Sequence, residues 1–83
     1  MNVLYFAWLR QKVGRGEETI DPPSSVRTIG DLAAFLASRG SGYADAFADM
    51  KRVRAALNQE HVDFTAAVAA GDEIAFFPPV TGG

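Results

Sequence analysis

The sequence predicts an α+β domain in which a mixed sheet of four to five strands carries one main helix on one face. Three observations support this prediction: a β-rich opening segment, one amphipathic helical segment in the middle, and a β-rich segment near the C-terminus. The 83 residues suffice for one domain, and 48% of them are hydrophobic, as is usual for globular proteins. Because a sheet and a helix each have one apolar surface to bury, the helix is expected to cover one sheet face.

The chain is expected to begin with a hairpin. Residues 2–8 are apolar, β-branched or aromatic, and the run is short enough for a strand. Residues 10–16 are mostly polar and contain two glycines, which predicts a turn. Residues 17–20 can form the second strand, which Pro22 and Pro23 must end because proline cannot donate to a ladder.

The one substantial helix is predicted over residues 28–39. Thr28 is placed to cap it, and Asp31 resembles the acid of a capping box. Gly40 stands where a helix-ending glycine belongs. Apolar residues recur at helical spacing and form one stripe for burial: Ile29, Leu32, Phe35 and Leu36.

The second half of the chain is expected to return to strands. A short helical turn is predicted over residues 43–50, followed by a strand over 52–57 and a brief strand over 61–64. After a glycine turn, residues 73–77 form the last strand. A hairpin, a crossing helix and further strands, with the last strand in the middle of the sheet, make a β-grasp plan.

The chemistry is predicted to lie beyond the folded domain of residues 1–77. Residues 78–83 are expected to form an extended, flexible tail that ends in Gly-Gly. Its two prolines keep the backbone near polyproline geometry, at about 3.1 Å per residue, and its last two residues have no side chain. Such an arm can bring the carboxylate of Gly83 into a narrow channel of a partner. The residues expected to enter with it are Pro78, Pro79, Val80, Thr81 and Gly82.

A carboxylate needs help from other proteins to react. Its pKa is about 3.3–3.7, so at neutral pH it is a poor electrophile that must first be activated, most directly by adenylation. The chain has no phosphate-binding glycine loop and no cysteine, and His61 is its single histidine. We therefore expect partners to supply the catalysis. No bound cofactor is expected, and no metal, because Asp45 and Asp49 lack further ligands.

Residues 71–83 resemble the ending of bacterial molybdopterin synthase small subunits, the MoaD group of ubiquitin-like carriers. The motif Phe-Phe-Pro-Pro-Val-Thr-Gly-Gly is specific, whereas Gly-Gly alone also ends thiamine-pathway carriers, transfer-RNA thiolation carriers and ubiquitin. Residues 3–7 and 57–59 are similar too, so the resemblance extends over the whole chain.

This resemblance implies a ubiquitin-like β-grasp fold and a reaction cycle. An adenylating enzyme (MoeB-like) activates Gly83 with ATP, and a sulfur donor protein converts the carboxylate to a thiocarboxylate. The tail then enters a large subunit (MoaE-like) and yields its sulfur to a cyclic pterin phosphate. The resemblance places the catalytic residues on the large subunit and implies a heterotetramer of two small and two large subunits.

A docking patch is predicted from the alternation of side chains along the first and last strands. Asn2 and Glu73 are expected to face solvent, and these two strands are neighbours in a β-grasp sheet. The side chains that share their face form the predicted partner-docking patch: Leu4, Phe6, Ala75 and Phe77. With the register shifted by one residue, Phe6 and Phe77 would be plain core residues instead.

Charge and hydropathy argue against two classes of partner. The net charge of −2 gives no basis for binding nucleic acid. No apolar run approaches the roughly 20 residues that a membrane span needs, and no signal peptide is evident, so a cytoplasmic protein is expected. Lys51, Arg52 and Arg54 can be read as a recognition site for an acidic partner or, more simply, as a solvated strand edge.

The residues leave other functions open. One is a protein modifier that uses the same Gly83 chemistry but ends in an isopeptide with a lysine. Another is a sulfur carrier for the thiamine or transfer-RNA thiolation pathway, and a third is a β-grasp interaction module without covalent chemistry. Intact mass separates the first and third from sulfur transfer, because only a carrier exchanges oxygen for sulfur at its terminus.

Overall fold

In the computed structural model, residues 1–79 are described and residues 80–83 are not. Within residues 1–79, no helix is long and apolar enough to cross a membrane. The elements of this part, in chain order, are β1 (Asn2–Tyr5), α1 (Ala7–Val13), β2 (Glu17–Thr19), α2 (Ile29–Ala37), α3 (Ser41–Ala46), the 3-10 turn η1 (Met50–Arg52), β3 (Arg54–Leu57), β4 (Glu60–Val62) and β5 (Glu73–Phe77).

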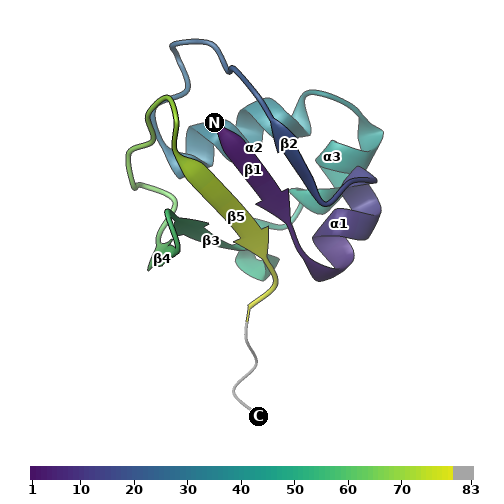
Figure 1. The fold of residues 1–83 in the computed structure, drawn as a ribbon. Helices are drawn as coiled ribbons and strands as arrows, with labels where there is room; N and C mark the ends of the chain where they lie inside the picture. Colours follow the sequence, from purple (N-terminus) through teal and green to yellow (C-terminus); the bar gives the residue numbers. More distant parts are fainter. Residues whose placement is uncertain (80–83) are drawn as a thin grey trace.

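The five strands form one mixed sheet in the order β2-β1-β5-β3-β4. β5 lies in the middle, parallel to β1 and antiparallel to β3. In Figure 1, α2 crosses behind the sheet, and the chain leaves β5 at the end where β1 also finishes. The predicted β-grasp plan, with the last strand in the centre, is therefore confirmed, and the sheet has five strands.

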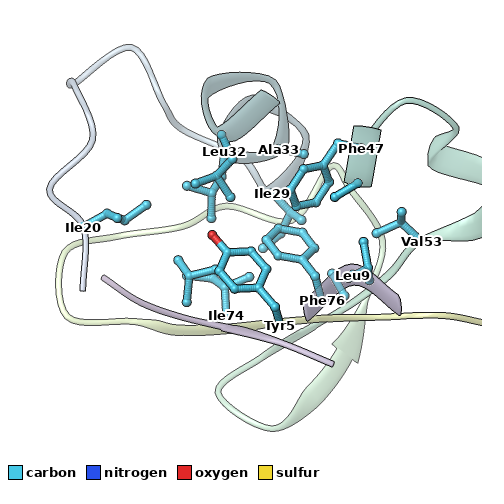
Figure 2. Close-up of a cluster of buried hydrophobic side chains, with 14 residues drawn as sticks. Tyr5, Leu9, Ile20, Ile29, Leu32, Ala33, Phe47, Val53, Ile74 and Phe76 are labelled. Atoms are coloured by element: carbon cyan, nitrogen blue, oxygen red, sulfur yellow. The ribbon is translucent and has the colours of Figure 1, made fainter. Parts of the chain in front are cut away.

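The core lies between the sheet and the helices (Figure 2). Alternate residues of β1 and β5 point toward α2 and are at most 1% exposed: Val3, Tyr5, Ile74 and Phe76. From α2, three of the four predicted stripe residues are fully buried, whereas Phe35 is only partly buried. The Phe76 ring packs edge-on against Phe47, with 4.9 Å between ring centroids. Full burial of such a side chain stabilises the fold by about 1.5–3 kcal/mol.

The predicted first strand is too long, and the predicted turn after it is wrong. β1 ends at Tyr5, because Ala7 adopts a left-handed conformation (φ 54°) that turns the chain away from the sheet. Helix α1 follows, its Leu9 is fully buried, and Gly14 ends it with a left-handed φ of 91°. Within residues 1–79 the helix α1 is thus added to the predicted main helix and to the short helical turn predicted over residues 43–50, where α3 lies.

The predicted start of α2 is confirmed, and its predicted end is wrong. Thr28 Oγ1 accepts from the Asp31 N–H at 3.1 Å, and Asp31 Oδ2 accepts from the Thr28 N–H at 3.2 Å, which completes the capping box. The helix stops at Ala37, because the Ser38 hydroxyl donates to the Phe35 carbonyl at 2.6 Å. Gly40 instead precedes the first residue of α3.

Two of the three strands of the second half, β3 and β4, are shorter than predicted. β3 begins at Arg54 because the Asp49 side chain accepts from the Lys51 N–H at 3.1 Å and holds η1. Asn58 and Gln59 both have positive φ, as in the two-residue hairpin turns that match strand twist, so β4 begins at Glu60, one residue earlier than predicted. β5 spans Glu73–Phe77, as predicted.

Candidate functional site

The chain leaves the sheet from its centre. β5 ends at Phe77, and Pro78 and Pro79 follow it. Because β1 runs parallel to β5, Phe6 lies at the same end of the sheet, and its N–H donates to the Phe76 carbonyl at 3.1 Å. Arg54 of β3 pairs with Phe77 on the other side. We call this the exit end, defined by Phe6, Arg54 and Phe77.

The remaining predicted tail residues lie outside the described part of the chain. Val80, Thr81, Gly82 and Gly83 therefore have no described position, and the predicted reactive carboxylate belongs to this segment. The structure instead describes the surface that surrounds the start of the tail.

The four residues of the predicted docking patch share one sheet face. Leu4 pairs with Ala75, and Asn2 pairs with Glu73. Because side chains alternate along a strand, these four side chains lie on the same face of the sheet. The extended backbone at Phe6 continues the alternation of β1, so its side chain follows Leu4 on this face. Leu4, Ala75 and Phe77 are partly exposed, and Phe6 is 47% exposed. The alternative register, with Phe6 and Phe77 in the core, is therefore wrong.

Two further residues extend this outer face across the sheet. Ala56 pairs with Ala75, and His61 pairs with Ala56. The His61 ring lies 5.1 Å from the Phe77 ring, centroid to centroid. Sequence reasoning placed His61 on a strand but not beside Phe77. The two positive-φ residues at 58 and 59 set this register, and a two-residue turn there would have predicted the pairing.

A buried ionic cluster lies on the other, helix-covered side. Glu18 of β2 is 9% exposed and is the one buried charged residue in the described part of the chain. Its Oε2 accepts from the hydroxyls of Tyr5 (2.8 Å) and Tyr43 (2.7 Å), and its Oε1 accepts from Arg39 Nη1 (3.0 Å). Arg15 adds a longer ion pair at 3.5 Å.

The pKa shifts of this cluster indicate a structural role. Burial acts to raise the pKa of Glu18, but the hydrogen bonds from Tyr43, Tyr5 and Arg39 outweigh it and hold that pKa below its ordinary value. Burial and the hydrogen bond to Glu18 raise the pKa of Tyr5 far above its ordinary value. Glu18 thus stays ionised and Tyr5 neutral near pH 7, so neither is poised for acid–base catalysis.

No three or more His, Asp or Glu side chains in residues 1–79 are arranged to hold a metal ion. A hollow of about 500 Å³ lies between residues 21–27 and 67–70, at the end of the sheet opposite the exit end. The outer face and the exit end are therefore the candidate functional site.

Comparison with known proteins decides the family. The ThiS family matches residues 3–83. The chain belongs to the ThiS family. It is 39% identical over 83 residues to the molybdopterin synthase sulfur carrier subunit of Escherichia coli (strain K12), covering 100% of this chain and 99% of that protein. It is 34% identical over 86 residues to the Homo sapiens protein of the same name, covering 100% and 93%. The family resemblance predicted from the sequence is confirmed.

Solved structures share the fold of this ThiS-family chain. SAMP1 from Haloferax volcanii superposes with a TM-score of 0.73 at 29% identity, covering 100% of this chain and 98% of that one. Subunit 1 of a putative molybdopterin converting factor from Pyrococcus furiosus gives a TM-score of 0.68 at 27% identity, covering 95% of each chain. A chain from the complex of subunits 1 and 2 of the Helicobacter pylori 26695 molybdopterin-converting factor gives 0.65 at 23% identity, covering 99% and 96%. The ubiquitin-like β-grasp prediction is confirmed.

Proposed function

We propose that this chain is the sulfur carrier subunit of a molybdopterin synthase and that the carboxylate of Gly83 carries the sulfur. The observation that supports this most strongly is 39% identity, over the whole chain, to a protein of that name. The geometry also supports this function. β5 ends at Phe77, so the chain leaves the sheet at the exit end, next to the apolar side chains of the outer face.

The proposed cycle uses the chain as a substrate. On an adenylating enzyme, a Gly83 carboxylate oxygen attacks the α-phosphorus of ATP, and pyrophosphate leaves. Hydrosulfide supplied by a sulfur donor protein then attacks the acyl carbon. AMP departs as the leaving group, and the product is the Gly83 thiocarboxylate. On the large subunit, the thiocarboxylate sulfur attacks a carbon of the cyclic pterin phosphate that carries a phosphate ester. The carbon–oxygen bond to the phosphate breaks, and the phosphate keeps the electron pair and stays attached through its other ester bond. Hydrolysis of the resulting thioester returns the Gly83 carboxylate and leaves sulfur on the pterin.

In this proposal the outer face holds the chain on each partner in turn. Phe6 and Phe77 are the aromatic anchors, and Leu4 and Ala75 complete the apolar surface between them. Each aromatic side chain that becomes fully buried contributes about 1.5–3 kcal/mol from desolvation. Because one face serves every partner, the adenylating enzyme and the large subunit bind in succession rather than together.

One observation favours a second candidate, a protein modifier. The structure of small archaeal modifier protein 1 from H. volcanii superposes with a TM-score of 0.69 at 25% identity, covering 96% of this chain. Both candidates require activation of the Gly83 carboxylate. They differ in the nucleophile that takes the activated acyl group, which is hydrosulfide for the carrier and a lysine amine for the modifier.

Intact-mass measurement separates the two candidates. The chain is incubated with ATP and the adenylating enzyme and sulfur donor of its own organism. A carrier gains the mass difference between sulfur and oxygen, and a modifier yields a ladder of heavier conjugates in extract.

The matched control carries one extra residue after Gly83 and keeps residues 1–79 intact. We expect this variant to fold normally and to gain no sulfur. In a strain that lacks the native carrier, it should not restore synthesis of the molybdenum cofactor. Restoration of the cofactor by the extended variant would overturn the proposal.

A further inference from the structure

Two exposed cations border the exit end, and the proposed function leaves them unused. Arg54 pairs with Phe77 across β3 and β5, so its side chain lies on the outer face next to the start of the tail. Lys51, in η1, lies directly beside it, because Arg54 Nη1 donates to the Lys51 carbonyl at 3.1 Å. The same nitrogen donates to the Val53 carbonyl at 3.0 Å. We call Lys51 and Arg54 the basic rim.

The charge of the basic rim is not neutralised within residues 1–79. In this part of the chain the two salt bridges belong to Arg15 and Arg39, and both end on the buried Glu18. A guanidinium has five N–H donors, and the hydrogen bonds of Arg54 come from one of its nitrogens. Those two bonds orient the group while its other donors remain available to a planar carboxylate.

Two other cations near this end are engaged differently. The Arg10 guanidinium folds over Gly16, where a Cβ would lie 3.2 Å from its Cζ, and Glu17 lines the same hollow. Arg52 stacks over the Trp8 ring at 5.1 Å.

Two acids lie near the basic rim. The Asp49 carboxylate accepts from the backbone N–H of Lys51 at 3.1 Å and caps η1. Asp63 lines a hollow of about 390 Å³ together with Arg54 and His61. Its carboxylate accepts hydrogen bonds from the Thr65 hydroxyl and N–H, so it is held within its own loop.

The opposite end of the sheet is acidic. Asp72 and Glu73 stand at the start of β5, and Glu60 lies beside them because Leu57 pairs with both Glu60 and Ile74. Along β3 and β5 the charged side chains therefore run from acidic at the start of β5 to basic at the exit end. Arg27 at the acidic end and Glu17, which pairs with Leu4 near the exit end, carry the opposite charges. The charge asymmetry along β3 and β5 orients the exit end toward an acidic surface during encounter.

We propose that the basic rim binds carboxylates of the large subunit beside the opening that receives residues 78–83. The inference rests on the proposed function, and it names the chemistry of the partner's surface. It commits to the large subunit because the curated relatives are named as subunits of molybdopterin synthase. The rim is continuous with the docking patch through Phe77, so a partner seated on that patch meets Lys51 and Arg54.

The test measures the association rate of the full chain with the purified large subunit as a function of salt. The double variant Lys51→Gln with Arg54→Gln is expected to associate about three- to tenfold more slowly at low ionic strength. The difference should largely disappear at roughly 1 M salt, where the Debye length falls to about 3 Å. Arg54→Lys, which keeps the charge, should retain most of the rate.

Arg27→Gln is the matched control, because it removes an exposed cation next to the hollow at the opposite end of the sheet. The proposal is overturned if Arg27→Gln slows association as much as the double variant, if neither has an effect, or if only binding to the adenylating enzyme changes. Lys51→Gln alone repeats the test without touching the hydrogen bonds of Arg54.

A failure of this proposal can be distinguished from a failure of the proposed function. Sulfur transfer from a preformed thiocarboxylate, at a large-subunit concentration that saturates binding, should be unchanged in the double variant. If the association rate and the sulfur transfer are both unchanged in the double variant, the basic rim does not bind the large subunit. The sulfur-carrier proposal is not affected by that outcome.

Discussion

β1 and β5 contribute side chains to both faces of the sheet, and the two faces differ in how far their side chains are buried. On the inner face, the side chains from both strands are at most 1% exposed and pack under α2. On the outer face, Leu4, Ala75 and Phe77 remain partly exposed, and Phe6 is 47% exposed. Apolar side chains lie on both faces, with Asn2 and Glu73 also on the outer one, yet only the inner face is covered by the chain itself. An apolar patch that the chain leaves exposed on the outer face of its sheet indicates that another molecule covers this patch.

The neighbours Phe76 and Phe77 offer the largest test of this comparison. Phe76→Ala should lower the free energy of unfolding by about 3–5 kcal/mol, because it leaves a cavity against Tyr5 and Phe47. Phe77→Ala should lower it by about 1 kcal/mol or less, since its ring is already partly exposed. Urea unfolding of both variants measures the difference, and equal losses would show that the two faces are not energetically distinct.

The same comparison predicts the reverse order for binding. Phe6→Ala and Phe77→Ala should each weaken the complex with the large subunit by about 2 kcal/mol, roughly thirtyfold in Kd, as expected for aromatic anchors. Titration calorimetry measures the affinity, with Gln11→Ala as an exposed control outside the patch. Wild-type affinity in both phenylalanine variants would remove the outer face from the docking site.

A third prediction concerns the charge buried on the inner side. Glu18→Gln should lower the free energy of unfolding by about 1–3 kcal/mol near pH 7, because Arg39 and both tyrosine hydroxyls lose a charged acceptor. The folded-state pKa of Glu18 is depressed, so its contribution is present above the ordinary value of 4.5 and is lost as pH falls through the folded value. The gap between wild type and variant in urea unfolding should therefore narrow below about pH 4.5, whereas a gap that widens there would contradict this sign.

The smallest expected effect separates stability from recognition. Thr28→Ala removes the side-chain cap of α2 and should lower the free energy of unfolding by about 1 kcal/mol. The outer face is not touched, so the affinity for the large subunit should stay at the wild-type value. A loss of affinity as large as that of Phe77→Ala would mean that α2 takes part in docking.

Local rules were enough for several features of this protein. The capping box of Thr28 and Asp31 depends on residues three positions apart, and alternation along β5 depends on immediate neighbours. The same period-two rule placed Phe6 and Phe77 on the outer face before any fold was known. The C-terminal motif indicated the family in the same way, because it is a contiguous run of residues.

Contacts between distant segments decided the rest. Helix α1 packs against α3 where Gly42 allows it, since a Cβ there would collide with the Lys12 carbonyl oxygen. Glu18 becomes a buried anion only when β2 meets Tyr43 and Arg39, more than twenty residues away. The basic rim likewise exists because antiparallel pairing brings Arg54 beside Phe77. The sequence alone determined the elements whose interactions are short-range, and the tertiary structure decided which charges and rings meet, because those contacts form only once the strands have paired.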